Sequence, residues 1–188
     1  MIDTANLDRA YEQAIEKIRR NQKKIGVAFP HVANGEHGEY NREKPSFWTG
    51  GFWGGLLWLA YRETHDPALL ETACEIESVL DGPLDEYAHI HHDVGFMWLP
   101  TAVAHYKATG SEKSRARGLK AASHLMGRFN LNGRFIRAWN DEVYENSQGW
   151  AIIDCMMNIP LLYWASSELN DPRFRQVAMA HADTVLRH

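Results

Sequence analysis

The sequence predicts an all-α fold of stacked helical hairpins, on three observations. An apolar segment that opens on a glycine and an aromatic residue recurs along the chain, over residues 51–61, 95–106 and 149–163. Each copy is followed by a turn and an amphipathic stretch, as in repeat proteins built from helical hairpins. The alternation of apolar and polar residues that is typical of strands is confined to a short loop segment at 134–138.

The first helix is predicted over about residues 3–24. Its apolar residues recur at steps of three and four, and Arg and Lys gather at its end, where a helix favours positive charge. The next segment, residues 46–67, is apolar on nearly every side. We therefore expect a helix that is buried all round and stops at His65.

Three short polar motifs predict where the amphipathic helices begin. Asp66-Pro67 combines a capping aspartate with a proline at the first helical position. The same pair recurs at Asp171-Pro172, and Gly110-Ser111 is a weaker form.

The length of 188 residues predicts one domain over residues 1–188. Hairpins with one apolar and one amphipathic helix each would form an inner and an outer layer, as a solenoid or as a closed toroid. The long loops 26–49, 81–92 and 128–148 would then meet at the N-termini of the inner helices. These loops hold polar residues without a packing role, so we expect the functional site among them.

Composition excludes several classes of protein. The formal charge is -4 and no basic block is present, so nucleic acid is not an expected partner. No apolar stretch approaches the ~20 residues of a membrane span, and no signal peptide is evident, so no membrane association and a cytoplasmic location are expected. Cys74 and Cys155 have no metal-type spacing and are expected to be reduced thiols.

The densest polar cluster holds His89, His91, His92 and Asp93, just before the second apolar segment. Such a cluster admits a zinc or iron site, although no further ligand stands out at a defined spacing. Asp93 also suits the N-cap of the helix that it opens. A catalytic carboxylate is the third interpretation, and it is compatible with the cap.

Asp154 stands inside the third apolar segment, about one turn from its start. An unpaired charge there is costly, so Asp154 must meet a partner, face a cavity or hold a proton. A carboxylic acid kept protonated by apolar neighbours suits a general acid. Asn158 lies on the same helical face and could bond whatever Asp154 contacts, and Pro160 predicts a kink.

Four tryptophans lie in or beside the predicted loops, namely Trp48, Trp53, Trp139 and Trp150. Flat aromatic faces over a polar pocket commonly hold sugar rings, while most tryptophans of helical proteins belong to the core. Trp139 is the least explained by core packing. Structural roles, or none, are expected for Trp58, Trp98, Trp164, His105, His124, His181 and His188.

Three segments resemble a known enzyme family. WTGGFWGGLLWLAY at 48–61, HHDVGFMWLP at 91–100 and SQGWAIIDCMMNIPLLYWAS at 147–166 are similar to the unsaturated glucuronyl hydrolases, glycoside hydrolase family 88. The resemblance implies an α/α toroid of six helical hairpins, without metal or cofactor. It also implies removal of the 4,5-unsaturated uronic acid from the non-reducing end of lyase-generated oligosaccharides, by hydration of the C4=C5 bond.

Motif by motif, the resemblance assigns roles to residues of this chain. Asp154 would be the general acid and base, and Asp93 would hold the ring or water and help set the proton state of Asp154. His92 and Trp139 match positions that line the sugar subsite, and Trp48 is a looser match.

Members of this family have nearly twice the present length, so the chain corresponds to the N-terminal half of the toroid. We expect the open half-ring to expose apolar helix faces. The chain would then be a truncated product, or it would pair with a second copy or a complementing C-terminal half. Two alternatives stay open: an unsaturated rhamnogalacturonyl hydrolase, and an inactive fragment that only binds sugar or a partner.

Overall fold

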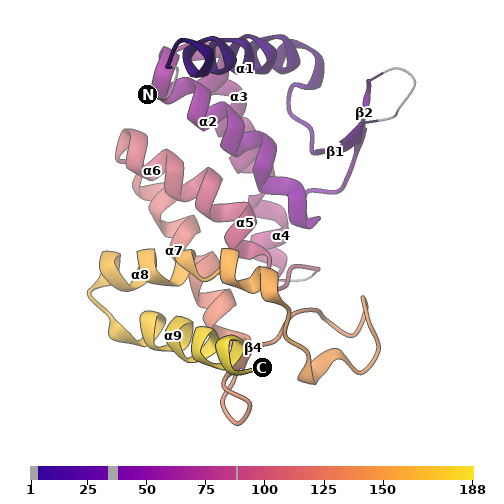
Figure 1. The fold of residues 1–188 in the computed structure, drawn as a ribbon, viewed down its shortest axis with the longest axis vertical. Coiled ribbons are helices and arrows are strands. Elements are labelled where there is room, and N and C mark those ends of the chain that lie inside the picture. The colour runs from indigo at the N-terminus through magenta and orange to yellow at the C-terminus, as the bar shows by residue number, and fades with distance from the viewer. Residues whose placement is uncertain (1–3, 34–37, 88) are drawn as a thin grey trace.

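The computed structural model describes residues 4–33, 38–87 and 89–188 and confirms the predicted all-α fold (Figure 1). Its helices form an inner and an outer layer that pack pairwise as hairpins, so that α2 packs on α3, α5 on α7 and α8 on α9. The inner helices are α2 (Phe52–Thr64), α5 (Val94–Trp98), α6 (Ala104–Thr109) and α8 (Pro160–Leu169). The outer helices are α1 (Thr4–Ile25), α3 (Pro67–Val79), α7 (Glu112–Gly127) and α9 (Pro172–Arg187).

The predicted helix starts are confirmed at atomic detail. The Asp66 carboxylate accepts the Ala68 N–H at 3.1 Å, and Pro67 is the first residue of α3. Asp171 caps α9 through the Arg173 N–H, and Ser111 caps α7 through the Ser114 N–H. α1 begins at Thr4, so residue 3 of the predicted helix lies outside the described residues, and α2 ends before His65 as expected.

The second apolar segment remains continuous despite its internal proline. α5 passes through a π-helical turn (Leu99–Val103) into α6, and Pro100 lies at the start of that turn. A π-helical turn accommodates the backbone hydrogen bond that a proline cannot donate. Trp58 and Trp98 are fully buried here, as predicted, within the core between the two layers.

The third apolar segment is not one helix, which corrects the sequence interpretation. Ile152 is extended, a short 3-10 helix (Ile153–Met157) follows, and α8 starts only at Pro160. Proline is favoured at the first helical position, so Pro160 begins a helix instead of kinking one. Asp154 therefore lies in a turn ahead of α8 and not inside an apolar helix.

Short strands and a short helix interrupt the predicted loops. β1 (Pro30–Ala33) pairs with β2 (Tyr40–Arg42), a hairpin that the sequence did not indicate. β3 (Phe129–Asn130) pairs with β4 (Phe135–Ile136), within the segment that showed some alternation. α4 (Asp81–Glu86) occupies the start of the predicted loop 81–92.

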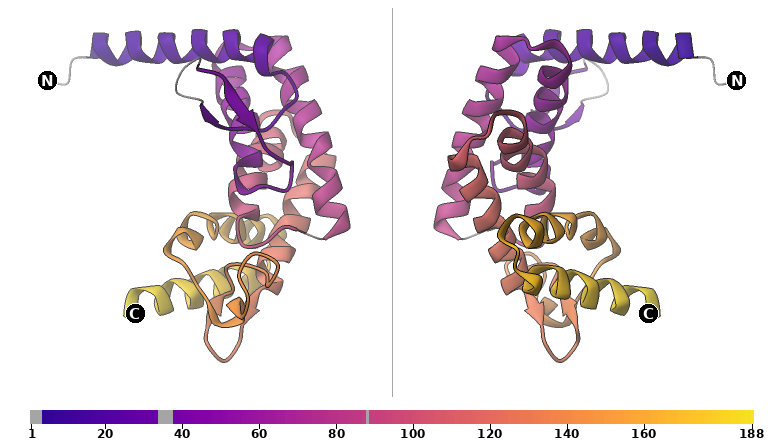
Figure 2. Two further views of the ribbon diagram at one scale, coloured as in Figure 1. Left: turned by 90° about the vertical axis from the view of Figure 1, so that its right-hand side faces the viewer. Right: turned by 90° about the vertical axis from the view of Figure 1, so that its left-hand side faces the viewer.

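The expectation that residues 46–67 are buried all round is wrong. Phe52, Leu56 and Leu59 of α2 are 39%, 45% and 58% exposed, and their spacing places them on one face of the helix. α1 extends from the body of the molecule and is mostly exposed (Figure 2). Phe52 contacts the rings of Trp48 and Phe96, but much of this apolar face of α2 is left exposed.

Candidate active site

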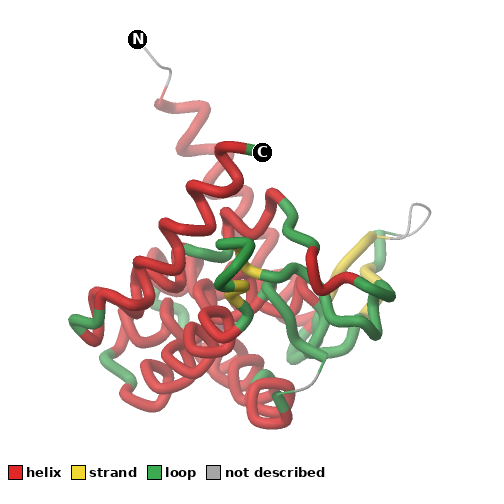
Figure 3. The backbone as a smooth tube through the Cα atoms, turned by 90° about the horizontal axis from the view of Figure 1, so that it is seen from below, coloured by secondary structure: helices red, strands yellow, loops and turns green. Residues whose placement is uncertain are grey.

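The longer loops that the structure describes gather on one side of the molecule, beside both strand pairs, whereas short turns between helices lie on the other side (Figure 3). The N-termini of α2, α5 and α8 point to the same side, as the hairpin repeat predicted (Figure 1). A cavity of about 690 Å³ opens there. Its lining includes Trp48, Asp93, Trp139 and Asp154, four of the residues chosen from the sequence.

Asp93 lies at the N-cap position of α5, but its carboxylate caps no backbone N–H. Instead, Asp93 Oδ1 accepts a hydrogen bond from the Asn158 amide at 3.3 Å and lies 3.3 Å from His92 Nε2. The side chain is only 7% exposed. Burial raises the pKa of Asp93, opposed by His92 and Asn158, and the charge of Asp154 raises it further. A capping role alone does not explain this placement.

Asp154 is the accessible member of the carboxylate pair. Its side chain is 42% exposed and lines the cavity, so of the expected ways to accommodate its charge the structure shows a cavity and a partner, His92. Asp154 Oδ1 lies 3.0 Å from His92 Nε2, the same nitrogen that faces Asp93. Two carboxylates, one buried and one open to the cavity, thus meet on one histidine. When two carboxylates lie in different environments, one can act as an acid while the other stays ionised.

His92 lies behind the aspartates and not on the cavity surface. Its side chain is fully buried, and it is not among the lining residues, whereas its neighbour His91 is. His92 Nδ1 lies 2.6 Å from the carbonyl oxygen of Ala138, which can only accept, so Nδ1 carries a proton and donates it. The sequence linked His92 to the sugar subsite, and the structure places it in contact with both aspartates.

His91, His92 and Asp93 form the cluster that the sequence interpreted as a possible metal site. One ligand-type atom from each lies within 4.8 Å of the others. The donor set does not fit a metal, however, because both nitrogens of His92 already face protein oxygens. Burial, with repulsion from His92, lowers the pKa of His91 to about 3. We therefore assign the cluster to hydrogen bonding.

Asn158 links the carboxylate of Asp93 to the backbone of α5. It is fully buried, donates to Asp93, and accepts the Phe96 N–H at 2.8 Å through Oδ1. Gly95 allows this approach, since a Cβ there would stand 2.4 Å from the Cα of Asn158. Asn158 was expected to bond whatever Asp154 contacts, or substrate; in the structure its side chain contacts the backbone of α5 and Asp93.

Aromatic side chains form much of the cavity wall. Trp139 packs edge-on against Tyr144, with ring centroids 4.8 Å apart, and Trp150 meets Trp139 edge-on and Tyr144 at a tilt. Trp48, the first residue of the 3-10 helix before α2, lines the same cavity and is 36% exposed. Trp53, in contrast, is buried and donates to the Gly26 carbonyl. The wall has apolar faces of the kind that pack on sugar rings.

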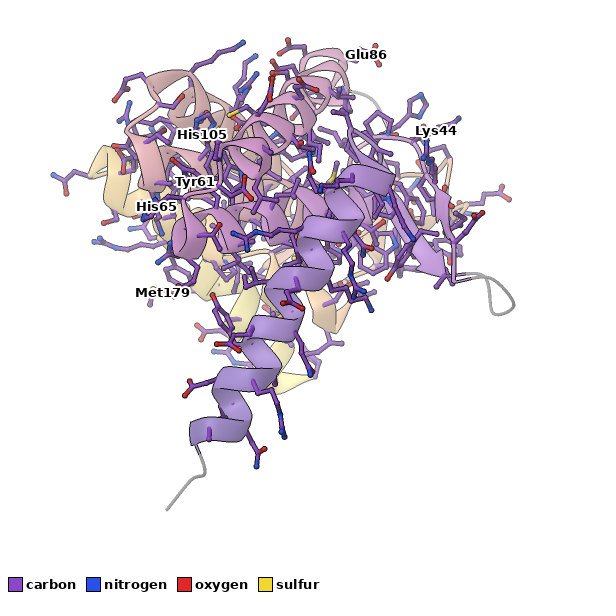
Figure 4. The ribbon with its side chains drawn as sticks, turned by 90° about the horizontal axis from the view of Figure 1, so that it is seen from above. Lys44, Tyr61, His65, Glu86, His105 and Met179 are labelled. Carbon is purple, nitrogen blue, oxygen red and sulfur yellow. The ribbon has the colours of Figure 1, made fainter. Side chains whose placement is uncertain are left out.

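Charged groups at the cavity include some that sequence reasoning missed. Lys44 is the sole lysine or arginine that lines it among residues 4–33, 38–87 and 89–188. Figure 4 shows Lys44 beside the β1–β2 hairpin, on the opposite side of the molecule from His105. His89 and Glu142 join two of the loops through a contact of 3.1 Å. Lys44 was missed because nothing in the sequence distinguishes a loop lysine that lines a cavity from any other surface lysine.

A second polar cluster lies away from the cavity, around His105, for which a structural role or none was expected. His105 Nδ1 lies 2.6 Å from Glu77 and 2.8 Å from Ser114, and its ring stacks on Trp58. Arg117 also donates to the buried Glu77 at 2.7 Å and bonds Asp81. Both Glu77 and Ser114 contact the same nitrogen of His105, so this is a packing network between α3, α6 and α7 and not a nucleophile with its base.

The fold and the cavity define a class: a helical-hairpin protein with a carboxylate pair and an aromatic wall. Among known proteins, the chain is 39% identical over 164 residues to an unsaturated glucuronyl hydrolase from Bacillus sp. strain GL1, covering 87% of this chain and 43% of that protein. It is 34% identical over 182 residues to an unsaturated chondroitin disaccharide hydrolase from Streptococcus agalactiae, covering 96% of this chain and 45% of that protein. No protein-family profile matches.

A solved structure gives the same result. The crystal structure of unsaturated glucuronyl hydrolase from Bacillus sp. GL1 superposes with a TM-score of 0.89 at 37% identity, over 96% of this chain and 48% of that one. The chain is a homologue of the unsaturated glucuronyl hydrolases, and the resemblance and the α/α-toroid fold class are confirmed. It spans about half the length of the curated relatives it matches.

Proposed function

We propose that this chain carries the catalytic carboxylates of a glycoside hydrolase that removes a 4,5-unsaturated uronic acid from the non-reducing end of lyase-generated oligosaccharides. The observation that supports it most is the pair of aspartates that meet on His92, with Asp154 open to the cavity and Asp93 buried. The names of the relatives support the same substrate class. The sequence motifs at 48–61, 91–100 and 147–166 resemble those of glucuronyl hydrolases, which favours a glucuronyl over a rhamnogalacturonyl substrate.

In this proposal the reaction is a hydration and not a displacement at the anomeric carbon. Asp154 gives its proton to C4, the C4=C5 electron pair forms the new C–H bond, and the ring oxygen shares the positive charge left at C5. Water then adds to C5 and returns a proton to the Asp154 carboxylate. The resulting hemiketal opens, and the glycosidic bond at C1 breaks to release the remaining sugar.

The surrounding residues have matching roles in the proposal. Asp93 orients the sugar ring or the water, and its charge influences the proton state of Asp154. Trp139 and Trp48 provide apolar faces for sugar rings. His92 and Asn158 act on the aspartates from behind, since both are fully buried.

We also propose that the exposed apolar face of α2 packs against further hairpins of the toroid. The chain covers 48% of the related crystal structure, and that structure therefore contains residues with no counterpart here. Phe52, Leu56 and Leu59 form a continuous apolar stripe of the kind that marks an interaction surface. Complementation by the remaining half would cover it. In sedimentation, a well-behaved folded monomer with this face free would contradict the need for such a partner.

The experiment that tests the proposed activity follows the ultraviolet absorbance of the conjugated C4=C5 bond in an unsaturated chondroitin disaccharide. Loss of absorbance that depends on Asp154 supports the hydrolase. An Asp154→Asn variant that binds the disaccharide as the parent does, where the parent shows no turnover, would favour the alternative of a sugar-binding module.

A further inference from the structure

His92 is not among the residues that line the cavity, yet its Nε2 lies within 3.3 Å of a carboxylate oxygen of both aspartates. We propose that His92 is a positioning residue that holds one proton between the carboxylates of Asp93 and Asp154 and supplies it to Asp154. The placement of the proton stands on the geometry alone. Its part in turnover rests on the proposed function.

The contacts of the His92 ring determine which of its two nitrogens carries a proton. The Ala138 carbonyl has no hydrogen to give, so the contact of 2.6 Å requires a proton on Nδ1. A neutral ring then has a bare lone pair on Nε2. That lone pair would face Asp154 Oδ1 at 3.0 Å and Asp93 Oδ1 at 3.3 Å.

An ionised carboxylate is also an acceptor only. With both aspartates ionised and Nε2 bare, the buried Nε2 would face two carboxylate oxygens with no proton between them, which is costly. The Asn158 amide donates to Asp93 Oδ1 but supplies no proton to Nε2. One added proton removes the conflict. It resides either on Nε2, between two carboxylates, or on a carboxyl oxygen that donates to Nε2, and it moves between these positions along contacts of 3.0 and 3.3 Å.

The surroundings keep the ring in this orientation. Arg128 Nη2, from the end of α7, donates to the same Ala138 carbonyl at 3.0 Å. His91 packs against His92 with ring centroids 5.1 Å apart, and its pKa is lowered to about 3. From α9, His181 accepts the Ile136 N–H, and the buried Cys155 thiol has a pKa raised to about 12. None of these groups competes for the shared proton at neutral pH.

Asp154 is the natural recipient of that proton. Its oxygen makes the shorter contact with Nε2, and its side chain is 42% exposed to the cavity against 7% for Asp93. His92, Asp93 and Asp154 form a trio that shares the proton. When Asp154 gives its proton to a substrate carbon, this trio loses one proton. When water adds, its proton restores the trio, so the balance closes over one cycle.

Nitrogen-15 NMR of histidine-labelled chain tests the placement without any requirement for turnover. We expect Nδ1 of His92 to be protonated, and Nε2 to share a proton with a carboxylate at neutral pH. In an Asp93→Asn, Asp154→Asn double variant, Nε2 should become a plain acceptor at neutral pH. A bare Nδ1, or an Nε2 of the parent chain that is already a plain acceptor at neutral pH, would overturn the proposal.

His92→Gln tests the link to turnover, since a glutamine amide can still donate to both aspartates but holds no exchangeable acid proton. We expect the fall of kcat with rising pH to begin at lower pH, and kcat at neutral pH to drop at least about tenfold with KM little changed. His124→Gln replaces another buried histidine, outside the trio, and should keep the parental pH profile. A His92→Gln variant with the parental profile would contradict the proposal, whereas a parent inactive on every substrate would contradict the proposed function alone.

Discussion

Asn158 donates a hydrogen bond to Asp93 at 3.3 Å, across 65 residues of sequence. The same amide group accepts the Phe96 N–H at 2.8 Å, so one buried side chain fixes both the carboxylate and the first turn of α5. Inner helices of two successive hairpins are joined at this point. The position of the buried aspartate is therefore set by helix packing as well as by its own loop.

This junction predicts a specific weakness at Gly95. A methyl group there would stand 2.4 Å from the Asn158 Cα and 2.5 Å from its carbonyl oxygen. Both are backbone atoms, which cannot move away by a change of side-chain rotamer. Gly95→Ala should therefore lower the free energy of unfolding by about 3 kcal/mol, measured in urea. Gly149 has open space around it, so Gly149→Ala should change stability by less than about 0.5 kcal/mol. Equal stabilities of the two variants would contradict this packing.

The buried Glu77 should support stability in a pH-dependent way. Burial acts to raise the pKa of Glu77, but hydrogen bonds from His105, Ser114 and Arg117 outweigh it and lower the pKa below its usual value. Glu77→Gln should cost about 3 kcal/mol at neutral pH, because it leaves Arg117 without a buried partner. A lowered folded-state pKa stabilises above the ordinary glutamate pKa, so the difference should shrink as the pH falls below it.

Urea unfolding of the parent and Glu77→Gln at neutral and acidic pH measures this difference. Glu75→Gln, an exposed position on the same helix, is the matched control and should be close to neutral at both values. A Glu77→Gln deficit that stays constant on acidification would contradict the assigned pKa shift.

Lys44 should contribute to the affinity for anionic sugars. It brings the one lysine or arginine charge to a cavity whose described lining also holds Glu43, Asp93, Glu142 and Asp154. Removal of a unit charge from an exposed site corresponds to roughly 1 kcal/mol, so Lys44→Gln should raise KM or Kd about fivefold with kcat unchanged. The effect should weaken at high salt. Lys23→Gln makes the same charge change on α1, and an equal effect there would show general attraction only.

The exposed apolar face of α2 gives a prediction about association. Leu59 is 58% exposed, whereas Leu57 on the same helix is fully buried. Leu59→Gln should reduce self-association or improve solubility and leave stability within about 0.5 kcal/mol, while Leu57→Gln should destabilise by several kcal/mol. Sedimentation and urea unfolding separate the two effects. Unchanged sedimentation of Leu59→Gln together with a monomeric parent would argue against a partner for this face.

Local signals in the sequence were sufficient for much of the fold. The hairpin repeat and the caps at Asp66, Ser111 and Asp171 depend on nearby residues, and the structure confirms them. The short helix around Asp154 was missed, because an apolar run does not reveal that Ile152 is extended or that Pro160 starts a helix. Hydropathy also cannot separate a buried apolar face from one that is left open, as on α2.

Candidate site residues were found from their unusual types in apolar surroundings, but their arrangement depends on contacts between distant parts of the chain. Asp93 and Asp154 were chosen and do line one cavity. The contacts of His92 with Ala138 and Asp154 span 46 and 62 residues, so no local pattern could show that this histidine is buried behind them. The same holds for the network around Glu77 and for Lys44.

The most direct test of the central claim compares Asp154→Asn with the parent chain, by the loss of ultraviolet absorbance from an unsaturated chondroitin disaccharide. The two should have the same circular dichroism, because the change preserves shape at a half-exposed position. Turnover by the variant should be lower by about 10²-fold or more, since the acid proton is gone. Equal turnover of both proteins would contradict the assignment of Asp154 as the acid.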